Sequence, residues 1–344
     1  MPGTFLGYPF DEEIFLLNWQ AAVDPVLTAI IDSGAVQENG VIANMIANGS
    51  NFYTIPFYNV LGGTDDNYDG ETNITITAPD GGSQSGVVYG RAHGWKDQDF
   101  VHDFNSGANP MQQIASQVNK YWGKKRQARL LSIINGIFGI TDDTTDNWDA
   151  WQLHTLNIAT TSTSVADANK VDATSAADCM QKAVGDNANI FSMAIMHSKV
   201  ANNLAKQQLL EYRKYTDPSG IERSLPIADW NGLTVVVDDG CPATANSSAT
   251  GEKDYQTFLF GQGAIQYAKA PVRHAVEIAR VPLEAGGYDT LITRLRETLH
   301  PNGFSYTLPD STVSPTDVQL GTAAQWKVVT NPKNIAIARI VSNG

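Results

Sequence analysis

Residues 51–95 read as a long antiparallel β-ribbon that has too few large apolar side chains to build a core of its own. Its first strand, Phe52 to Val60, is rich in aromatic and β-branched residues, and Pro56 within it favours an edge position. A turn-rich tip follows from Gly62 to Gly70, and Thr72 to Ala78 then alternates between apolar and polar side chains, as strands do. Because an isolated two-stranded ribbon is only marginally stable in water, this one is expected to lie on another surface.

The longest helical pattern runs from Ser106 to Ile140, with Pro110 placed where a helix tolerates proline, in its first turn. About thirty residues at ~1.5 Å per residue would span ~45 Å, which is longer than a small domain is wide. A second helix is predicted from Asp11 to Ile31, and residues 41–50 read as a connector.

The rest of the chain mixes short helices with strands, so the predicted fold class is α+β. Residues 141–171 read as a loop or an irregular hairpin, and Tyr288 to Leu299 fits a helix or an extended segment equally well. Helices are predicted over residues 173–184 and 198–212, and strands over residues 190–196, 233–237, 256–260, 272–279 and 335–341.

Charge is distributed unevenly along the chain, whose formal net charge is −13. Residues 1–105 hold fourteen acidic side chains and only two basic ones, Arg91 and Lys96. The ribbon tip carries the acidic set Asp65, Asp66, Asp69 and Glu71, and the long helix carries the basic set Lys120, Lys124, Lys125, Arg126 and Arg129. Both sets fit solvated faces, and they also fit a contact in which the acidic tip of one copy meets the basic helix of another.

Candidate metal sites are weak. Asp65 to Gly70 matches the first half of a calcium-binding EF-hand loop, but Ile76 stands where the bidentate glutamate belongs, so an acidic turn is favoured. The segment from His93 to His102 gathers acidic residues without a zinc-ligand spacing, and it reads as a solvated hinge. No metal is expected.

Other enzyme motifs are also missing from the sequence. Gly261-Gln262-Gly263 follows a strand but lacks the third glycine of a dinucleotide-binding turn, and Cys179 reads as a packed helix residue. The longest apolar stretch, Leu130 to Ile140, is about half the length of a membrane span. We therefore expect a protein that is neither an enzyme nor a membrane protein, that needs no cofactor, and that is made inside the cell.

The order of arm, ribbon, long helix and mixed core resembles that of tailed-phage major capsid proteins with the Hong Kong 97-like fold. The segments that carry the resemblance are spread along the chain: Phe10 to Phe15 with Trp19, Ala194 to Val200 with Leu204 and Leu209-Leu210, Phe258 to Ala264, and Leu299 to Gly303. Their order and spacing, rather than any single segment, make the resemblance specific.

The resemblance implies a division of the chain into regions that all belong to one shell subunit. It implies an N-terminal arm with a helix over residues 1–50, an extended ribbon (the E-loop) over 51–104, a peripheral domain with the spine helix over 105–188, an axial domain over 189–265, a return to the peripheral domain over 266–312, and C-terminal strands of the axial domain over 313–344. The glycine-rich stretch at residues 261–264 would then be a strand connection.

The function that the resemblance implies is structural. The chain would self-assemble as hexamers and pentamers into the icosahedral head of a tailed phage and enclose double-stranded DNA without sequence-specific binding. Portal, scaffold and decoration proteins are the expected partners, and the location is the virion after synthesis in the host cytoplasm. Two alternatives stay open: an encapsulin-type compartment shell, and a metal-dependent enzyme that uses the His93–His102 region.

Overall fold

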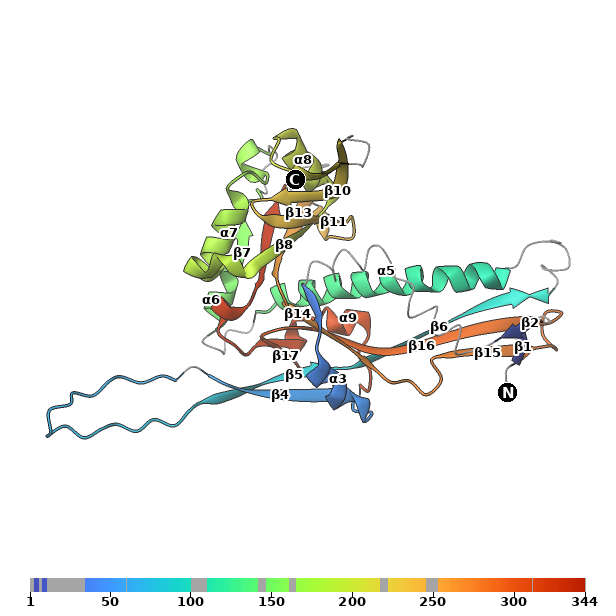
Figure 1. Cartoon of the computed structure of the whole chain (residues 1–344), viewed down its shortest axis with the longest axis horizontal. Coiled ribbons are helices and arrows are strands. Elements are labelled where there is room, and N and C mark those ends of the chain that lie inside the picture. The colour runs from blue at the N-terminus through green and yellow to red at the C-terminus, as the bar shows by residue number, and fades with distance from the viewer. Residues whose placement is uncertain are drawn as a thin grey trace.

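The computed structural model describes residues 3–5, 8–10, 35–59, 61–99, 110–141, 147–160, 165–216, 222–245, 253–310 and 312–343. Figure 1 shows two sheet-based bodies with a long helix between them and a ribbon that projects from the lower body. The predicted α+β class is confirmed. The helix expected over Asp11 to Ile31 lies outside the described residues. At the N-terminus, β1 (Gly3–Phe5) and β2 (Tyr8–Phe10) pair as a short antiparallel hairpin.

The upper body is built on a mixed eight-stranded sheet. Its strands lie in the order β7 (Thr155–Asn157), β19 (Ile337–Ser342), β13 (Lys253–Gly261), β8 (Phe191–Met196), β11 (Leu233–Val237), β10 (Glu222–Trp230) and β9 (Glu211–Thr216), with β12 (Ala243–Ala245) paired to β13. The β8–β11 and β7–β19 pairs are parallel, and the other pairs are antiparallel. The strands expected over residues 190–196, 233–237, 256–260 and 335–341 all lie in this sheet.

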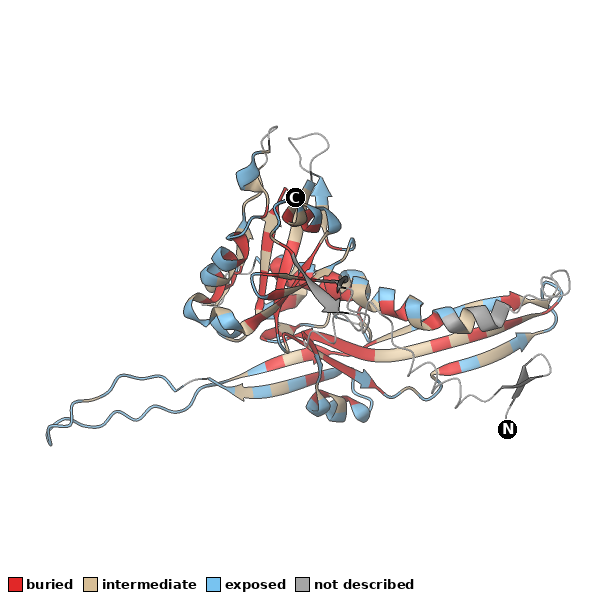
Figure 2. Ribbon diagram, turned by 45° about the horizontal axis from the view of Figure 1, so that its top comes forward, coloured by how far each residue is buried: buried red, intermediate tan, exposed pale blue. Residues whose placement is uncertain are grey.

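Strand β8 is covered on both faces, which explains why all of its residues except Ser192 are apolar. Ala194 and Met196 pack in one core with the helices α7 (Ser175–Val184) and α8 (Ser198–Lys206). Met193 and Ile195 face the opposite side and pack in the core that the long helix enters. Figure 2 shows the resulting buried centre of the upper body.

The lower body holds a five-stranded sheet around one long strand. β16 (Tyr288–Pro301) pairs antiparallel with β15 (Val276–Val281), β6 (Tyr89–Gln98) and β14 (Ile265–Ala270), and β14 pairs parallel with β3 (Val36–Glu38). The segment that the sequence left undecided is thus a strand, because it has strand partners along its length. The strand expected over residues 272–279 begins four residues later.

The long helix is α5 (Pro110–Phe138), which begins at the predicted proline and contains 29 residues. Its C-terminal half is buried through Leu130, Ile134 and Ile137, which share one core with both sheets. Its N-terminal half lies along the five-stranded sheet, with Val118 and Trp122 packed against Leu291 of β16 and other residues of that sheet. The helix therefore spans both bodies.

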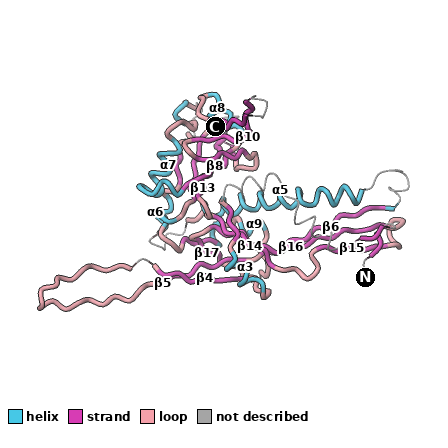
Figure 3. Tube along the Cα trace, in the orientation of Figure 1, coloured by secondary structure: helices cyan, strands magenta, loops and turns pink. Residues whose placement is uncertain are grey.

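The ribbon forms as expected only near its base. β4 (Phe52–Tyr58) and β5 (Gly81–Val87) pair antiparallel, from Phe52 opposite Val87 to Tyr58 opposite Gly81. The strand expected over Thr72 to Ala78 is wrong: residues 61–80 form an extended loop without a strand ladder (Figure 3). Its alternating pattern has no surface to bury, since the side chains of Ile74 and Ile76 are 75% and 92% exposed.

The connector expected over residues 41–50 is also wrong, because α3 (Gly40–Ala47) occupies it. The side chain of Asn39 accepts hydrogen bonds from the backbone N–H groups of Val41 and Ile42, which caps the helix. Ile42 and Ile46 lie one turn apart and are fully buried in the small core under the ribbon base.

Two further differences concern the segments 141–171 and 198–212. The loop expected over residues 141–171 contains α6 (Trp148–Gln152) and β7. The helix expected over 198–212 ends at Lys206, where Gln208 takes a left-handed conformation (φ 59°) and the next strand begins. Helix α9 (Asp317–Leu320) and the β17 (Phe304–Tyr306)–β18 (Trp326–Val328) pair complete the lower body.

Candidate assembly surfaces

The base of the ribbon is fixed to the lower body by hydrogen bonds. Tyr53 Oη lies 3.3 Å from Thr298 Oγ1, and the backbone N–H of Ser85 donates to Ser305 Oγ at 3.0 Å. Burial raises the pKa of the Tyr53 hydroxyl to about 12, so it stays protonated. Gly86 leaves room for the Tyr53 ring, since a Cβ at that position would lie 2.3 Å from it. The base of the ribbon is therefore held in place on the lower body.

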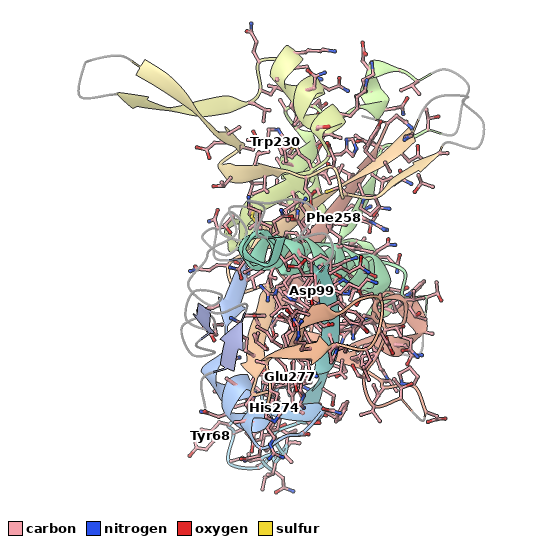
Figure 4. The ribbon with its side chains drawn as sticks, turned by 90° about the vertical axis from the view of Figure 1, so that its right-hand side faces the viewer. Tyr68, Asp99, Trp230, Phe258, His274 and Glu277 are labelled. Atoms are coloured by element: carbon pink, nitrogen blue, oxygen red, sulfur yellow. The ribbon has the colours of Figure 1, made fainter. Side chains whose placement is uncertain are left out.

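The tip, residues 61–80, exposes large apolar side chains. Leu61, Tyr68, Ile74 and Ile76 are all at least 75% exposed. Figure 4 shows Tyr68 at the margin of the molecule, far from the labelled core residues Trp230 and Phe258. Single exposed apolar residues are common, but four of them on one projecting loop indicate a surface that another molecule covers.

The acidic residues of the tip partly serve the loop itself. Asp69 accepts hydrogen bonds from the backbone N–H groups of Glu71 and Thr72, at 2.9 and 2.7 Å, and these bonds hold its pKa well below the ordinary value. Asp66 accepts a hydrogen bond from the backbone N–H of Thr75. Within the described ranges, no group of three or more potential metal-ligating side chains comes together, at the tip or elsewhere.

The predicted basic set of α5 divides into two parts. Lys120, Lys124 and Lys125 are exposed, and the Lys125 ammonium lies 5.7 Å from the centre of the Tyr121 ring. Arg126 and Arg129 instead turn toward the five-stranded sheet. Since α5 and the tip extend in opposite directions from the centre of the subunit (Figure 1), one chain does not bring its own lysines and acidic tip together.

Arg126 and Arg129 both bind Glu297 of β16, which is 1% exposed. Arg126 Nη2 lies 2.8 Å from Glu297 Oε2, and Arg129 Nη1 lies 3.1 Å from Oε1. Tyr89 and Tyr267 also donate their hydroxyls to this carboxylate, at 3.5 and 3.3 Å. Burial, followed by the charge of Glu297, raises the pKa of both tyrosines, so they remain neutral donors.

A second carboxylate extends these contacts to the chain around α9. Arg129 Nε donates to Asp317 Oδ1 at 2.8 Å, and Arg91 Nη2 donates to the same oxygen at 2.6 Å. Partial burial alone would raise the pKa of Asp317, but the hydrogen bonds from Arg129 and Arg91 outweigh it and hold that pKa below its ordinary value. We call Arg91, Arg126, Arg129, Glu297 and Asp317 the ionic network.

The histidine region does not form a metal site in the part of the chain that the structure describes. The His93 ring stacks on Tyr121 at 5.0 Å and meets Trp95 edge-on at 4.8 Å. Asp99 binds Arg280 at 2.6 Å. His102 and its neighbours lie outside the described residues.

The remaining candidate motifs have structural roles. Cys179 and Cys241 are buried free thiols, and burial raises the pKa of each to about 12, so neither is a reactive thiolate. Gly261-Gln262-Gly263 connects β13 to β14, as the sequence resemblance implied. Among the described helices, none is both long and apolar enough to cross a membrane.

A sequence comparison identifies the family. The Gp13-like family, described as major capsid protein 13-like, matches residues 151–336, which is more than half of the chain. The chain belongs to this family. As a Gp13-like major capsid protein it is a structural component of the virion shell, present as many copies, and it is not an enzyme. The reading as a metal-dependent enzyme is thereby set aside.

Individual relatives agree with the family assignment. The chain is 29% identical to the major capsid protein of Bacillus phage SPP1 over 317 residues, which are 91% of this chain and 90% of the relative. Its fold is similar to the capsid of Ralstonia phage GP4, with a TM-score of 0.57 at 10% identity over 91% of this chain and 88% of the other. The Cyanophage Pam1 capsid gives a TM-score of 0.54 at 12% identity and covers 94% of each chain.

Proposed function

We propose that this Gp13-like protein is the shell subunit of a tailed-phage head with the Hong Kong 97-like fold. In this proposal its hexamers and pentamers close into an icosahedral shell around double-stranded DNA. The observation that carries the proposal is the projecting tip, whose apolar side chains are uncovered in the single chain. A neighbouring subunit would cover them, which makes the ribbon the E-loop. The family match and the capsid-like fold support the same reading.

The domain division that we propose follows the expected ranges with two changes. The arm remains residues 1–50, the E-loop 51–104 and the returning part of the peripheral domain 266–312, and the axial domain still ends at residue 265. However, β7 pairs with β19, and α7 packs in the core of the eight-stranded sheet, so we move the boundary expected near residue 188 to the start of α6. Within 313–344, α9 and β18 join the peripheral domain, and only β19 joins the axial sheet.

The partners follow from the charge and from the proposed assembly. A net charge of −13 disfavours tight binding to phosphates, so we propose that the shell encloses the DNA without gripping its backbone tightly. We also propose that it does not bind the DNA sequence-specifically. Portal, scaffold and decoration proteins would complete the head, and synthesis would take place in the host cytoplasm.

Between subunits, we propose that the acidic tip meets the exposed lysines of a neighbour's α5. Asp65, Asp66, Asp69 and Glu71 would supply the acidic side, and Lys120, Lys124 and Lys125 the basic side. Arg126 and Arg129 stood in the expected basic set, but each already binds Glu297 of its own chain. Their part in this contact is therefore to hold the helix that presents the lysines.

The purified protein, imaged by negative-stain electron microscopy and analysed for nucleic acid, tests the proposal. We expect closed shells, capsomers or other large multimers, and phage-derived particles that contain DNA. A stable monomer at high concentration, with or without scaffold, would contradict the proposed function. Particles that contain a packaged enzyme instead of nucleic acid would favour an encapsulin-type shell.

A further inference from the structure

The ionic network joins four elements at the five-stranded sheet of the lower body. Arg126 and Arg129 come from α5, Glu297 from β16, Asp317 from α9 and Arg91 from β6. Arg129 is the central link, because its guanidinium contacts Glu297 Oε1 at 3.1 Å and Asp317 Oδ1 at 2.8 Å, and its side chain is 2% exposed.

Stability alone does not account for such a network. Buried ion pairs lose so much hydration that apolar side chains of similar volume are often as stable or more so. What the network supplies is geometry, since a planar guanidinium satisfies two carboxylates only from one orientation. The aromatic rings restrict it further: the guanidinium of Arg129 lies 4.6 Å from the centre of the Tyr89 ring, and that of Arg126 lies 5.2 Å from the centre of the Tyr267 ring.

The ionic network lies part-way along α5, between two cores that hold the helix in place. On its C-terminal side the helix is held by the large shared core, which includes Leu130 and Ile134. On its N-terminal side it is held by the small core of Val118 and Trp122. The network lies between the two, where Arg126 and Arg129 join α5 to Glu297 of β16.

We infer that the ionic network is a positioning device that sets the angle between α5 and β16 and thereby the curvature at which subunits join. The inference rests on the proposed shell function. A closed shell of hexamers and pentamers needs subunits that join within a narrow range of angles, and angles outside that range give open products or shells of other sizes. A network that holds α5 within that range would therefore favour one shell size.

Two variants test the inference, and one variant serves as the control. Arg129→Lys keeps the charge but replaces the planar fork by a point charge, which cannot hold both carboxylates in the same way. The second, apolar variant combines Arg126→Met, Arg129→Met, Glu297→Met, Tyr89→Phe and Tyr267→Phe, which leaves the Arg91–Asp317 pair intact. The control, Arg294→Lys, makes the same change in an exposed ion pair of β16, where Arg294 binds Glu277 at 2.9 Å.

The first readout is the size distribution of assembled particles, by sedimentation velocity and negative-stain imaging. We expect one dominant size class for the wild type and for Arg294→Lys. In both network variants we expect the fraction of particles in that class to fall at least twofold, with open or differently sized products in its place. A single wild-type size class in the apolar variant would overturn the inference. Failure of the wild type itself to assemble would overturn the proposed function and this inference with it.

The second readout uses the dissociated subunit and does not depend on assembly. Amide hydrogen exchange should be about tenfold faster over the N-terminal half of α5 in both network variants, and unchanged in α7 and α8. Unchanged exchange in α5 would overturn the inference. Faster exchange throughout the chain would show a general loss of stability instead of a local change in angle, and would overturn it as well.

Discussion

Glu297 is the residue on which most of the buried charge depends. Four side chains donate to it, two from arginines and two from tyrosines. A change to glutamine would remove the carboxylate that Arg126 and Arg129 share, although Arg129 would keep Asp317. Breaking a buried pair on one side costs roughly 3–5 kcal/mol. We therefore expect Glu297→Gln to lower the free energy of unfolding of the dissociated subunit by about that amount, measured by urea denaturation.

The matched control is Glu277→Gln. This change removes the carboxylate of an exposed ion pair, in which Glu277 of β15 binds Arg294 of the adjacent strand β16. Exposed pairs contribute ~0.2–1 kcal/mol, so this change should be nearly silent. Equal losses of unfolding free energy in the two variants would show that the burial of Glu297 adds nothing to the stability of the subunit.

Asp317 gives the network a dependence on pH. Its pKa in the folded chain lies below its ordinary value of about 3.9, so its contribution to stability is complete above that value and is lost as the pH falls through the folded pKa. In acid, the melting temperature of the wild type should therefore fall more steeply with decreasing pH than that of Asp317→Asn. The exposed Asp310→Asn serves as the control. Parallel curves for wild type and Asp317→Asn, measured by thermal unfolding below about pH 4, would refute the role of Asp317.

Which of these residues could be predicted from the sequence depends on how far apart the partners lie. The acidic residues of the tip and the lysines of α5 each lie close together in the sequence, so the local sequence alone reveals both sets. Glu297 and Asp317 lie 168 and 188 residues from Arg129, and nothing in their immediate sequence names that partner. The one available signal for Glu297 is its place in a segment, residues 288–299, whose pattern fits a helix and an extended segment equally well.

At the scale of elements, Gly261 marks the point where the chain passes from the eight-stranded to the five-stranded sheet. A Cβ there would lie 2.1 Å from the carbonyl oxygen of Ile190 and 2.5 Å from Ala336 Cβ, so backbone would have to move. We expect Gly261→Ala to cost about 1–3 kcal/mol of unfolding free energy, as overpacking does.

Gly40→Ala provides the comparison for Gly261→Ala. A Cβ at Gly40 would meet no atom within 4 Å, and alanine favours a helix over glycine, so this change in α3 should be neutral or slightly stabilising. Both are measured by thermal unfolding of the dissociated subunit. An equally mild effect at Gly261 would mean that the connection between the sheets tolerates displacement.

Elements were predictable where a local pattern coincided with a packed face, and not elsewhere. α5 carries a proline at its first turn and a long apolar face that both sheets cover, so the pattern and the packing agree. α3 was missed because it is short and only Ile42 and Ile46 of its apolar residues are buried, whereas Val41 and Met45 are exposed. The prediction for Thr72 to Ala78 failed in the opposite way, since its strand pattern pairs with no strand among the described residues.

At the scale of the whole molecule, the proposed contact between tip and helix can be tested by charge reversal. Lys120→Glu, Lys124→Glu and Lys125→Glu together should block or misdirect assembly and leave the subunit folded, because all three side chains are exposed. The contact repeats throughout a shell, so weak pairs add up. Assembly is measured by light scattering at low salt, where screening is weakest.

A compensating change strengthens the test. Asp65→Lys and Glu71→Lys reverse the tip while leaving in place the hydrogen bonds that Asp66 and Asp69 make within the loop. In the same chain as the lysine reversals, they should partly restore assembly. Normal assembly of the triple reversal alone would show that the lysines do not face the tip.

The exposed tip also makes the free subunit sensitive to proteases until a neighbouring subunit covers it. No lysine or arginine precedes Arg91, so trypsin has no site within residues 1–90. Chymotrypsin cleaves after aromatic residues, and Tyr68 is 95% exposed on an extended loop of the tip. The free subunit should be cut by chymotrypsin within the tip and the assembled particle should not, with trypsin sparing the tip in both. If so, assembly acts as protection from proteolysis, and subunits left over after the shell closes are the first to be degraded.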